Sequence, residues 1–348
     1  MNPGGIAVDA MGGDQSPREI VYGAVDFAAE TGREAIVVGD ETAIRALVAG
    51  IGAEELPLRI VPASEVIASG EPIRSIRSKR DSSMHVGYRL LRDGGAAALV
   101  SAGHTGAFMA LGKVIVGALD GVDRPALPAP LPRLEGGYTI LIDAGANLDC
   151  SPEHFRQFAV MGFHYARRVF GVDSPKVGLL SIGEEDSKGS VVLRDVSSIL
   201  RETRVNFIGN VEGNQLFSPR ADVVLCDGFI GNVTLKVAEG IAETIIQELR
   251  IGIKSGPLRR LGALPLRPVF RLLRKKIDYA EYGGVPLLGL KSVAIVAHGR
   301  STAKAIRNAM HVAATAADSD MTARIAREIS VLHETEDRLA AAGGGDAE

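Results

Sequence analysis

Short apolar runs rich in β-branched residues alternate with longer stretches of helical periodicity along most of the chain. The runs predict strands at 6–11, 34–40, 98–103, 139–145, 176–183, 205–210, 222–228 and 292–299. The periodic stretches predict helices at 153–169, 190–202, 232–249 and 301–316. Because this alternation is typical of a mostly parallel sheet with helices on both faces, the pattern predicts an α/β fold.

The pattern also bounds the domain organisation. The chain has 348 residues, 46% of them apolar, which is enough to bury a large core as one α/β domain or as two lobes. We assign residues 1–340 to a single α/β domain and expect the Ala- and Gly-rich residues 341–348 to form a flexible tail. Residues 251–288 interrupt the alternation, and we interpret them as a basic amphipathic helical arm inserted in the domain.

Composition and charge narrow the class of protein. The first residues lack the basic and apolar regions of a signal peptide, and no apolar run approaches the roughly 18 residues of a transmembrane helix, so we expect a cytoplasmic protein. Cys150 and Cys226 lie far apart without CxxC spacing, which suits a reducing compartment and provides no metal framework. Residues 251–276 hold eight basic residues and no acidic one, so this segment carries +8 and the rest of the chain −11.

Polar, glycine-containing motifs follow most of the predicted strands. They are DAMGGD, SAGHTGA, DAGAN, SIGEEDSKG, GNVEGN, CDGFIGN and AHGRS. Ligands of open α/β sheets bind outside the carboxyl ends of the strands, where glycine permits close approach and the following helix presents free N–H groups. Seven such motifs converging on one edge predict a binding site there.

Lysine and histidine side chains supply charged groups for this site. Lys188 stands beside Gly189 near a helix start, where an ammonium can hold a phosphate or stabilise an oxyanion; the plainer alternative is a solvated surface lysine. His104 and His298 lie in strand-end loops and can act as acid, base or phosphate donor, although such histidines are often only hydrogen-bonded surface groups.

The acids of SIGEEDSKG allow several interpretations. Glu184, Glu185 and Asp186 are consecutive and do not easily converge on one metal ion, and acids beside a helix start more often cap it. Neither GxGxxG nor GxxxxGK[ST] follows a predicted strand, which disfavours a dinucleotide site or a Walker-type site. We therefore expect no metal, and we expect the acids mainly to cap the helix or to bond to groups around the site.

Amide side chains point to acyl chemistry. Asn147, Asn214 and Asn232 each close a glycine-containing turn, where an amide can orient a substrate carbonyl without carrying charge or can simply tolerate a left-handed turn. Asp227 begins the last of these motifs, and Lys236 lies one helical turn beyond Asn232 on the same face. GxSxG is missing and neither cysteine has a neighbouring histidine, which disfavours a covalent acyl-enzyme.

Taken in order, these motifs closely resemble those of PlsX, a bacterial family of phosphate acyltransferases. RPAL (124–127), the extension of DAGAN to DAGANLDCSPEHFRQFAVMG and DYAEYGGVPLLG (278–289) add to the resemblance, which runs from about residue 6 to 310. It implies a large three-layer α/β/α fold with a mostly parallel sheet, related to phosphotransacetylases and isocitrate dehydrogenase, working as a homodimeric catalytic domain. The implied reaction joins inorganic phosphate to the fatty acyl group of acyl carrier protein, without a cofactor, and gives acyl phosphate for phospholipid synthesis.

The resemblance suggests roles for the candidate residues. Lys188 would hold phosphate, His104 or His298 would position or deprotonate it, and Asn232 with Lys236 would polarise the thioester carbonyl. Residues expected to line the substrate are Gly103, Thr105, Asn147, Glu184, Asn214, Asp227 and His298. Three positions depart from the family pattern, which usually has asparagine in place of His104, a serine- or asparagine-like turn of variable identity before GEE, and serine in place of Arg300.

The basic arm has two candidate partners. Its apolar stripe and basic flanks are formed by Leu266, Arg267, Phe270, Arg271, Leu273, Arg274 and Ile277. Pro257, Pro265 and Pro268 predict a division into two short helices. Such a segment can lie on an anionic membrane or receive the acidic carrier protein, and a solvated or dimer-facing helix pair is the plainer alternative. We expect peripheral association with the inner face of the cell membrane, where a membrane acyltransferase passes the acyl group to glycerol 3-phosphate, and no nucleic-acid partner.

Two other functions compete with this interpretation. A phosphotransacetylase using acyl-CoA would share the chemistry at the sheet edge, although the basic arm is large for one small cofactor. A non-catalytic scaffold at the membrane surface would leave the polar motifs at the strand ends without a purpose.

Overall fold

The predicted strands are all present, but they form two sheets. The computed structural model describes residues 4–68, 70–277 and 283–343, with side chains described up to 272 in the second range and 332 in the third. The first sheet has the order β10-β11-β4-β1-β2-β3 and the second the order β5-β6-β9-β7-β8. All pairings are parallel except β10 with β11 and β5 with β6.

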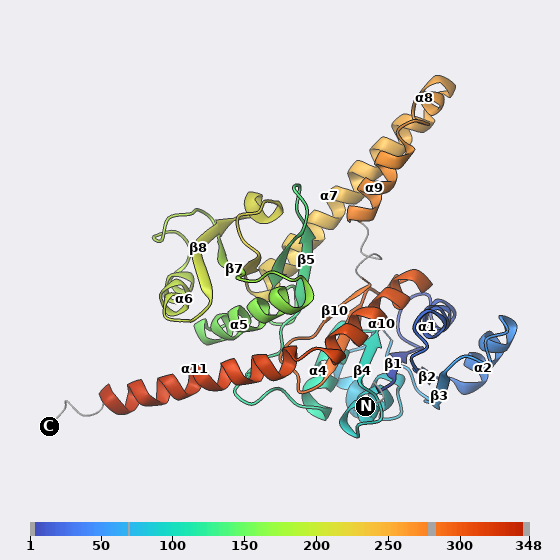
Figure 1. Cartoon of the computed structure of the whole chain (residues 1–348), viewed down its shortest axis with the longest axis horizontal. Helices are drawn as coiled ribbons and strands as arrows, with labels where there is room; N and C mark the ends of the chain where they lie inside the picture. The colour runs from blue at the N-terminus through green and yellow to red at the C-terminus, as the bar shows by residue number, and fades with distance from the viewer. Residues whose placement is uncertain (1–3, 69, 278–282, 344–348) are drawn as a thin grey trace.

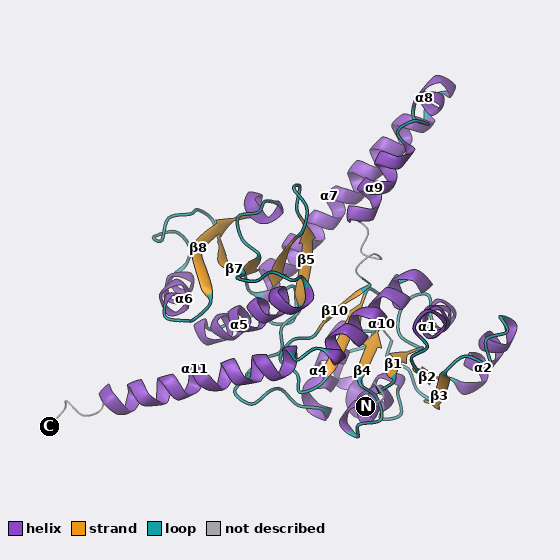
Figure 2. Cartoon of the chain, viewed as in Figure 1, coloured by secondary structure: helices purple, strands orange, loops and turns teal. Residues whose placement is uncertain are grey.

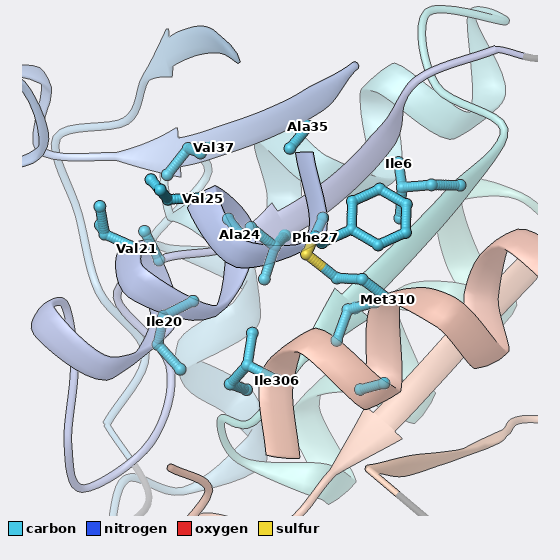
Figure 3. Close-up of a cluster of buried hydrophobic side chains, with 14 of the residues drawn as sticks. Ile6, Ile20, Val21, Ala24, Val25, Phe27, Ala35, Val37, Ile306 and Met310 are labelled. Carbon is cyan, nitrogen blue, oxygen red and sulfur yellow. The ribbon is translucent and has the colours of Figure 1, made fainter. Parts of the chain in front are cut away.

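The six-stranded sheet is formed by the first and last parts of the chain that resemble the family. Its strands are β1 (Ile6–Asp9), β2 (Ala35–Gly39), β3 (Leu58–Pro62), β4 (Ala98–Ser101), β10 (Gly284–Pro286) and β11 (Val293–Ala297). Helices α1 (Arg18–Thr31) and α10 (Ala303–Asp318) cover one face, and α3 (Ser83–Arg92) and α4 (Thr105–Ile115) cover the other. Figure 3 shows the first of these cores, with Phe27 of α1 beside Met310 of α10.

The five-stranded sheet is formed by the middle of the chain. Its strands are β5 (Pro128–Pro132), β6 (Tyr138–Ile142), β7 (Lys176–Ser181), β8 (Asn206–Glu212) and β9 (Val223–Leu225). Helices α5 (Pro152–Val169), α6 (Val191–Arg201) and α11 (Met321–Gly343) contribute to the core on one face. The short helix η2 (Gly213–Phe217) and the start of α7 (Gly228–Lys254) contribute to the core on the other. Both sheets therefore have apolar layers on both sides.

Strand β5 was not predicted, because its sequence PAPLP has proline at every second position. Proline cannot donate a backbone hydrogen bond and is confined to edge strands. Strand β5 is the edge of its sheet and pairs only with β6, so the missing N–H groups need no partner strand.

The remaining short elements are α2 (Glu41–Gly50) and η1 (Ile73–Arg77) beside the six-stranded sheet.

The basic segment lies at the end of a long projecting helix. Helix α7 was predicted only at 232–249, but it continues to Lys254 and carries α8 (Pro257–Gly262) at its far end (Figure 1). Helix α9 (Arg267–Ile277) follows, so the two short helices predicted from the prolines are confirmed. Strand β10, inside the range 251–288, belongs to the six-stranded sheet (Figure 2). The remaining residues of the DYAEYGGVPLLG motif, 278–282, lie outside the described residues.

None of the helices that the structure describes is long and apolar enough to cross a lipid bilayer.

Candidate functional site

The polar motifs lie at the carboxyl edges of both sheets, so the prediction of one shared edge is wrong. DAMGGD, SAGHTGA and AHGRS follow β1, β4 and β11 of the six-stranded sheet, whereas DAGAN, SIGEEDSKG, GNVEGN and CDGFIGN belong to the five-stranded sheet. Periodicity identifies strands but does not show which strands pair. Helix α7 connects the two groups, because Lys236 on this helix lies close enough to His298 to affect its pKa.

A buried aspartate organises the edge of the six-stranded sheet. Asp9, the last residue of β1, accepts hydrogen bonds from the Ser101 hydroxyl at 2.7 Å and the Met11 backbone N–H at 3.1 Å. Burial raises the pKa of its carboxyl group, and these hydrogen bonds oppose that change. Asp9 therefore joins β1 to β4 beneath the predicted site, a role that the sequence analysis missed.

His104 begins helix α4 as its N-cap. Its Nδ1 accepts a hydrogen bond from the Ala107 backbone N–H at 3.3 Å, so the neutral ring carries its proton on Nε2. This engagement leaves Nε2–H as a donor and makes Nδ1 unavailable as a base. Asparagine is also a favoured N-cap residue, which explains how histidine can stand where the family usually has asparagine. Gly103 and Thr105 flank the ring and are half-buried.

His298 has a similar arrangement after β11. Its Nδ1 accepts a hydrogen bond from the Arg300 backbone N–H at 3.1 Å, so the neutral ring again carries its proton on Nε2. Burial, followed by the positive charge of Lys236, lowers the pKa of His298, and the ring is therefore neutral near pH 7. Lys236 itself is exposed and pairs with Glu239 at 2.8 Å.

A second buried aspartate organises the edge of the five-stranded sheet. The carboxylate of Asp143 accepts hydrogen bonds from the backbone N–H groups of Leu127, Gly145, Ala146 and Asn147, at 2.7–3.2 Å. Burial raises its pKa. The Asn147 side-chain amide donates to Asp143 and to the Pro125 carbonyl, both at 2.8 Å. Both amide hydrogens of Asn147 are thus used within the protein, which leaves only Oδ1 for a ligand.

The first turn of α7 packs directly on this loop. Asp227 caps the helix by accepting a hydrogen bond from the Ile230 N–H at 2.8 Å, and the Gly228 N–H donates to the Asn147 carbonyl at 2.7 Å. A Cβ atom on Gly231 would lie 1.9 Å from the Asp143 carbonyl oxygen. The glycines of CDGFIGN therefore serve the packing of a helix on a loop, whereas the sequence predicted close approach to a ligand.

Asn232 follows these glycines and faces the same edge. A Cβ atom on Gly145 would lie 3.4 Å from the Cβ of Asn232, so the two residues are neighbours. The Asn232 side chain is exposed, and Asn214, in η2, is also exposed.

The acids of SIGEEDSKG do not cap helix α6, which is one of the two roles predicted for them; they bond to neighbouring side chains instead. Ser190 is the cap and accepts a hydrogen bond from the Leu193 N–H at 3.3 Å. Glu184 accepts a hydrogen bond from the Gln215 side chain at 2.5 Å, and Asp186 pairs with Arg201 at 2.6 Å. These acids therefore hold the loop against neighbouring segments of the protein.

Lys188 differs from these acids. It is exposed, and its ammonium forms no hydrogen bond or ion pair with any other residue that the structure describes. Because SIGEEDSKG follows β7 and CDGFIGN follows β9, Lys188 and Asn232 come after neighbouring parallel strands. The free cation and the exposed amide belong to one sheet edge.

The sequence analysis also missed a second cation near this edge. The exposed guanidinium of Arg124 makes no hydrogen bond or ion pair within the described part of the chain, yet it is close enough to Cys150 and His154 to affect their pKa values. The only indication of Arg124 in the sequence was its position in the RPAL motif. Burial raises the pKa of Cys150 to about 11 and also raises that of Cys226, so both thiols are protonated near pH 7. Neither is an activated nucleophile.

Comparison with known proteins decides the family. Residues 5–324 match the family described as "Fatty acid synthesis protein". The chain belongs to this family. It is 45% identical to a phosphate acyltransferase of Nitratidesulfovibrio vulgaris over 336 residues, which cover 96% of this chain and 97% of that protein. It is 44% identical to a phosphate acyltransferase of Aquifex aeolicus, over 94% of this chain and 97% of that protein.

Solved structures agree on the fold. A phosphotransacetylase from Streptococcus pyogenes superposes with a TM-score of 0.60 at 18% identity, covering 91% of this chain and 94% of that one. The EutD phosphotransacetylase from Staphylococcus aureus superposes with a TM-score of 0.59 at 17% identity, covering 90% and 94%. The predicted family and the three-layer α/β/α fold are confirmed, and the protein is an acyltransferase of lipid metabolism.

Proposed function

We propose that the protein transfers a fatty acyl group from acyl carrier protein to inorganic phosphate and so makes acyl phosphate for phospholipid synthesis. The observation that carries this proposal is the placement of Lys188, a cation without a partner among the described residues, and Asn232, an exposed amide, after neighbouring strands of one sheet. A phosphate dianion needs the cation, and a thioester carbonyl needs a neutral donor.

The reaction proceeds by direct attack. A phosphate oxygen forms a bond to the thioester carbonyl carbon, and the carbonyl electrons move to oxygen, where the Asn232 amide stabilises the negative charge. Collapse of this intermediate breaks the carbon–sulfur bond and releases the carrier as a thiolate, which takes a proton. Lys188 holds the phosphate, His104 donates to it from Nε2 because its Nδ1 atom is engaged, and His298 helps to position it. Phosphate is already a nucleophile near neutral pH, so positioning supplies most of the rate.

Incubation of the purified protein with palmitoyl-acyl carrier protein and inorganic phosphate, without added metal, tests this function. We expect release of free carrier and formation of acyl phosphate, both dependent on phosphate. A parallel reaction replaces the carrier with palmitoyl-CoA. Turnover with palmitoyl-CoA alone would instead favour the phosphotransacetylase-type enzyme.

The arm is proposed to contact the anionic inner face of the membrane, where the product passes to a membrane acyltransferase. Leucines on α8 support this, because Leu258 is 84% exposed and Leu261 67% exposed, with Arg259 and Arg260 between them. Of the predicted stripe, Leu266, just before α9, is exposed and Phe270 is half-buried, while Val269 and Leu272, outside the stripe, are also exposed. The side chains of Leu273, Arg274 and Ile277 lie outside the described residues. Arg267 and Arg271 are exposed.

Vesicle sedimentation checks the membrane contact. We expect the wild-type protein to pellet with anionic vesicles and the Leu258→Asp/Leu261→Asp variant to remain in the supernatant, because aspartate removes apolar contact and adds repulsion. Leu134→Asp, at another exposed leucine, is the matched control. Pelleting of both variants would show that the leucines of α8 do not make the contact, and failure of the wild type to pellet would refute the membrane contact.

A homodimer is proposed to form along α7. The exposed apolar residues of this helix recur at four-residue spacing, at Val233, Val237, Ile241 and Ile245. A helix face of this kind normally packs against another protein surface. Light scattering on the purified protein is the test, and a mass of one chain would contradict the proposal.

A further inference from the structure

Large apolar side chains are exposed at the carboxyl edge of the five-stranded sheet, beside the groups assigned to chemistry. Leu148 is 65% exposed, Ile182 84% and Phe229 63%. They belong to three different motifs, which follow β6, β7 and β9. Exposed apolar side chains gathered in one place mark a binding surface more often than single ones do.

The backbone places these residues near one another. The Asn147 carbonyl accepts a hydrogen bond from the Gly228 N–H at 2.7 Å, and Leu148 and Phe229 directly follow these two residues. Strand β7 pairs in parallel with β9, with Leu179 opposite Leu225. Continuing that register beyond the strands brings Ile182 level with Gly228.

We propose that Leu148, Ile182 and Phe229 bind the alkyl chain of the acyl donor while its carbonyl faces Asn232. This inference rests on the proposed function of the same edge. The edge combines apolar side chains with a free cation and an amide, and a fatty acyl thioester reacting with phosphate is apolar at one end and polar at the other. Transfer of each buried methylene from water favours binding, so long chains gain most from such a surface.

A second copy of this chain fits the surface less well. Ile182 lies in the same loop as Lys188, and Leu148 follows the DAGAN turn against which α7 packs. A partner subunit seated on these loops would cover the groups that must meet phosphate and the thioester. The apolar face of α7 continues from Phe229 to Ile245, and a dimer surface centred on Ile241 and Ile245 lies more than three helical turns beyond Phe229, which leaves these loops open.

Chain-length dependence tests the proposal. Ile182→Asn and Leu148→Asn are compared with the control Leu134→Asn. Leu134 is also an exposed leucine, but it lies after β5, at the amino end of β6, where Pro132 pairs with Tyr138. We expect the two site variants to lower kcat/KM for palmitoyl-acyl carrier protein by about 10-fold. Burial of each methylene group of the acyl chain strengthens binding roughly 4-fold, and asparagine removes part of the apolar surface that buries them. For butyryl-acyl carrier protein, and for the control with either donor, we expect changes within about 2-fold.

Equal losses for both donors, or no loss for either, would overturn the proposal, as would a change in mass by light scattering that accompanies the loss. A binding measurement with hexadecylphosphonate separates this inference from the proposed function, because it needs no turnover. Binding by the wild type that weakens about 10-fold in Ile182→Asn supports the alkyl site even without phosphate-dependent release. Unchanged binding in the variant, or no binding by the wild type, overturns it.

Discussion

Replacing Asn232 by alanine lowers kcat/KM by about 10²–10³-fold, because the amide donor that stabilises the developing oxyanion is lost. The side chain is exposed and does not cap α7, so the free energy of unfolding stays within about 0.5 kcal/mol of wild type. Replacing Lys188 by alanine raises KM for phosphate by about 10–100-fold, the range expected for one hydrogen bond to a charged group. Initial rates with varied phosphate and thioester measure both effects.

Asn206→Ala is the matched control for these variants. Asn206 is an exposed asparagine at the start of β8, so it lies at the amino end of the same sheet, away from the carboxyl edge of the site. We expect wild-type kinetics from this control and unchanged thermal unfolding in all three variants. Near-normal kcat/KM in both Asn232→Ala and Lys188→Ala would refute the assignment of the site to these residues.

Most strands could be predicted from sequence because a buried strand needs a short apolar run, as in IAVD of β1 and AIVVG of β2, whereas β3, β5 and β10 were not predicted. The division into two sheets could not, because it depends on which strands pair after each crossover. The polar motifs were correctly placed at strand ends. Their distribution over two edges followed from the same unpredicted pairing.

Local signals explain which site residues were found. Lys188 stands out because lysine beside glycine at a strand end is a local pattern, and its ammonium has no partner in the part of the chain that the structure describes. The role of Asp143 depends on N–H groups from Leu127 as well as from its own turn, a contact that only the folded chain creates. The acids beside α6 do not cap it because Ser190 is closer to the helix start and is a preferred cap.

Replacing Gly231 by alanine destabilises the protein by about 3 kcal/mol or more, because the new methyl group would meet the Asp143 carbonyl oxygen at 1.9 Å. That oxygen belongs to a backbone held by the buried carboxylate of the same residue, so rotation of a side chain cannot relieve the contact. Helix α7 must move away from the loop, and Asn232 moves with it. A displacement of about 1 Å can cost about 100-fold in rate, so activity falls even in protein that remains folded.

Gly240→Ala, in the same helix, separates this contact from the general effect of alanine in a helix. A Cβ atom at Gly240 would have no neighbour within 4 Å among the described residues, so alanine there raises the free energy of unfolding by about 0.5–1 kcal/mol. Urea unfolding monitored by circular dichroism measures both variants, and initial rates measure the displacement of Asn232. If Gly231→Ala were as stable and as active as Gly240→Ala, the close packing of α7 on the DAGAN loop could not be what positions the catalytic amide.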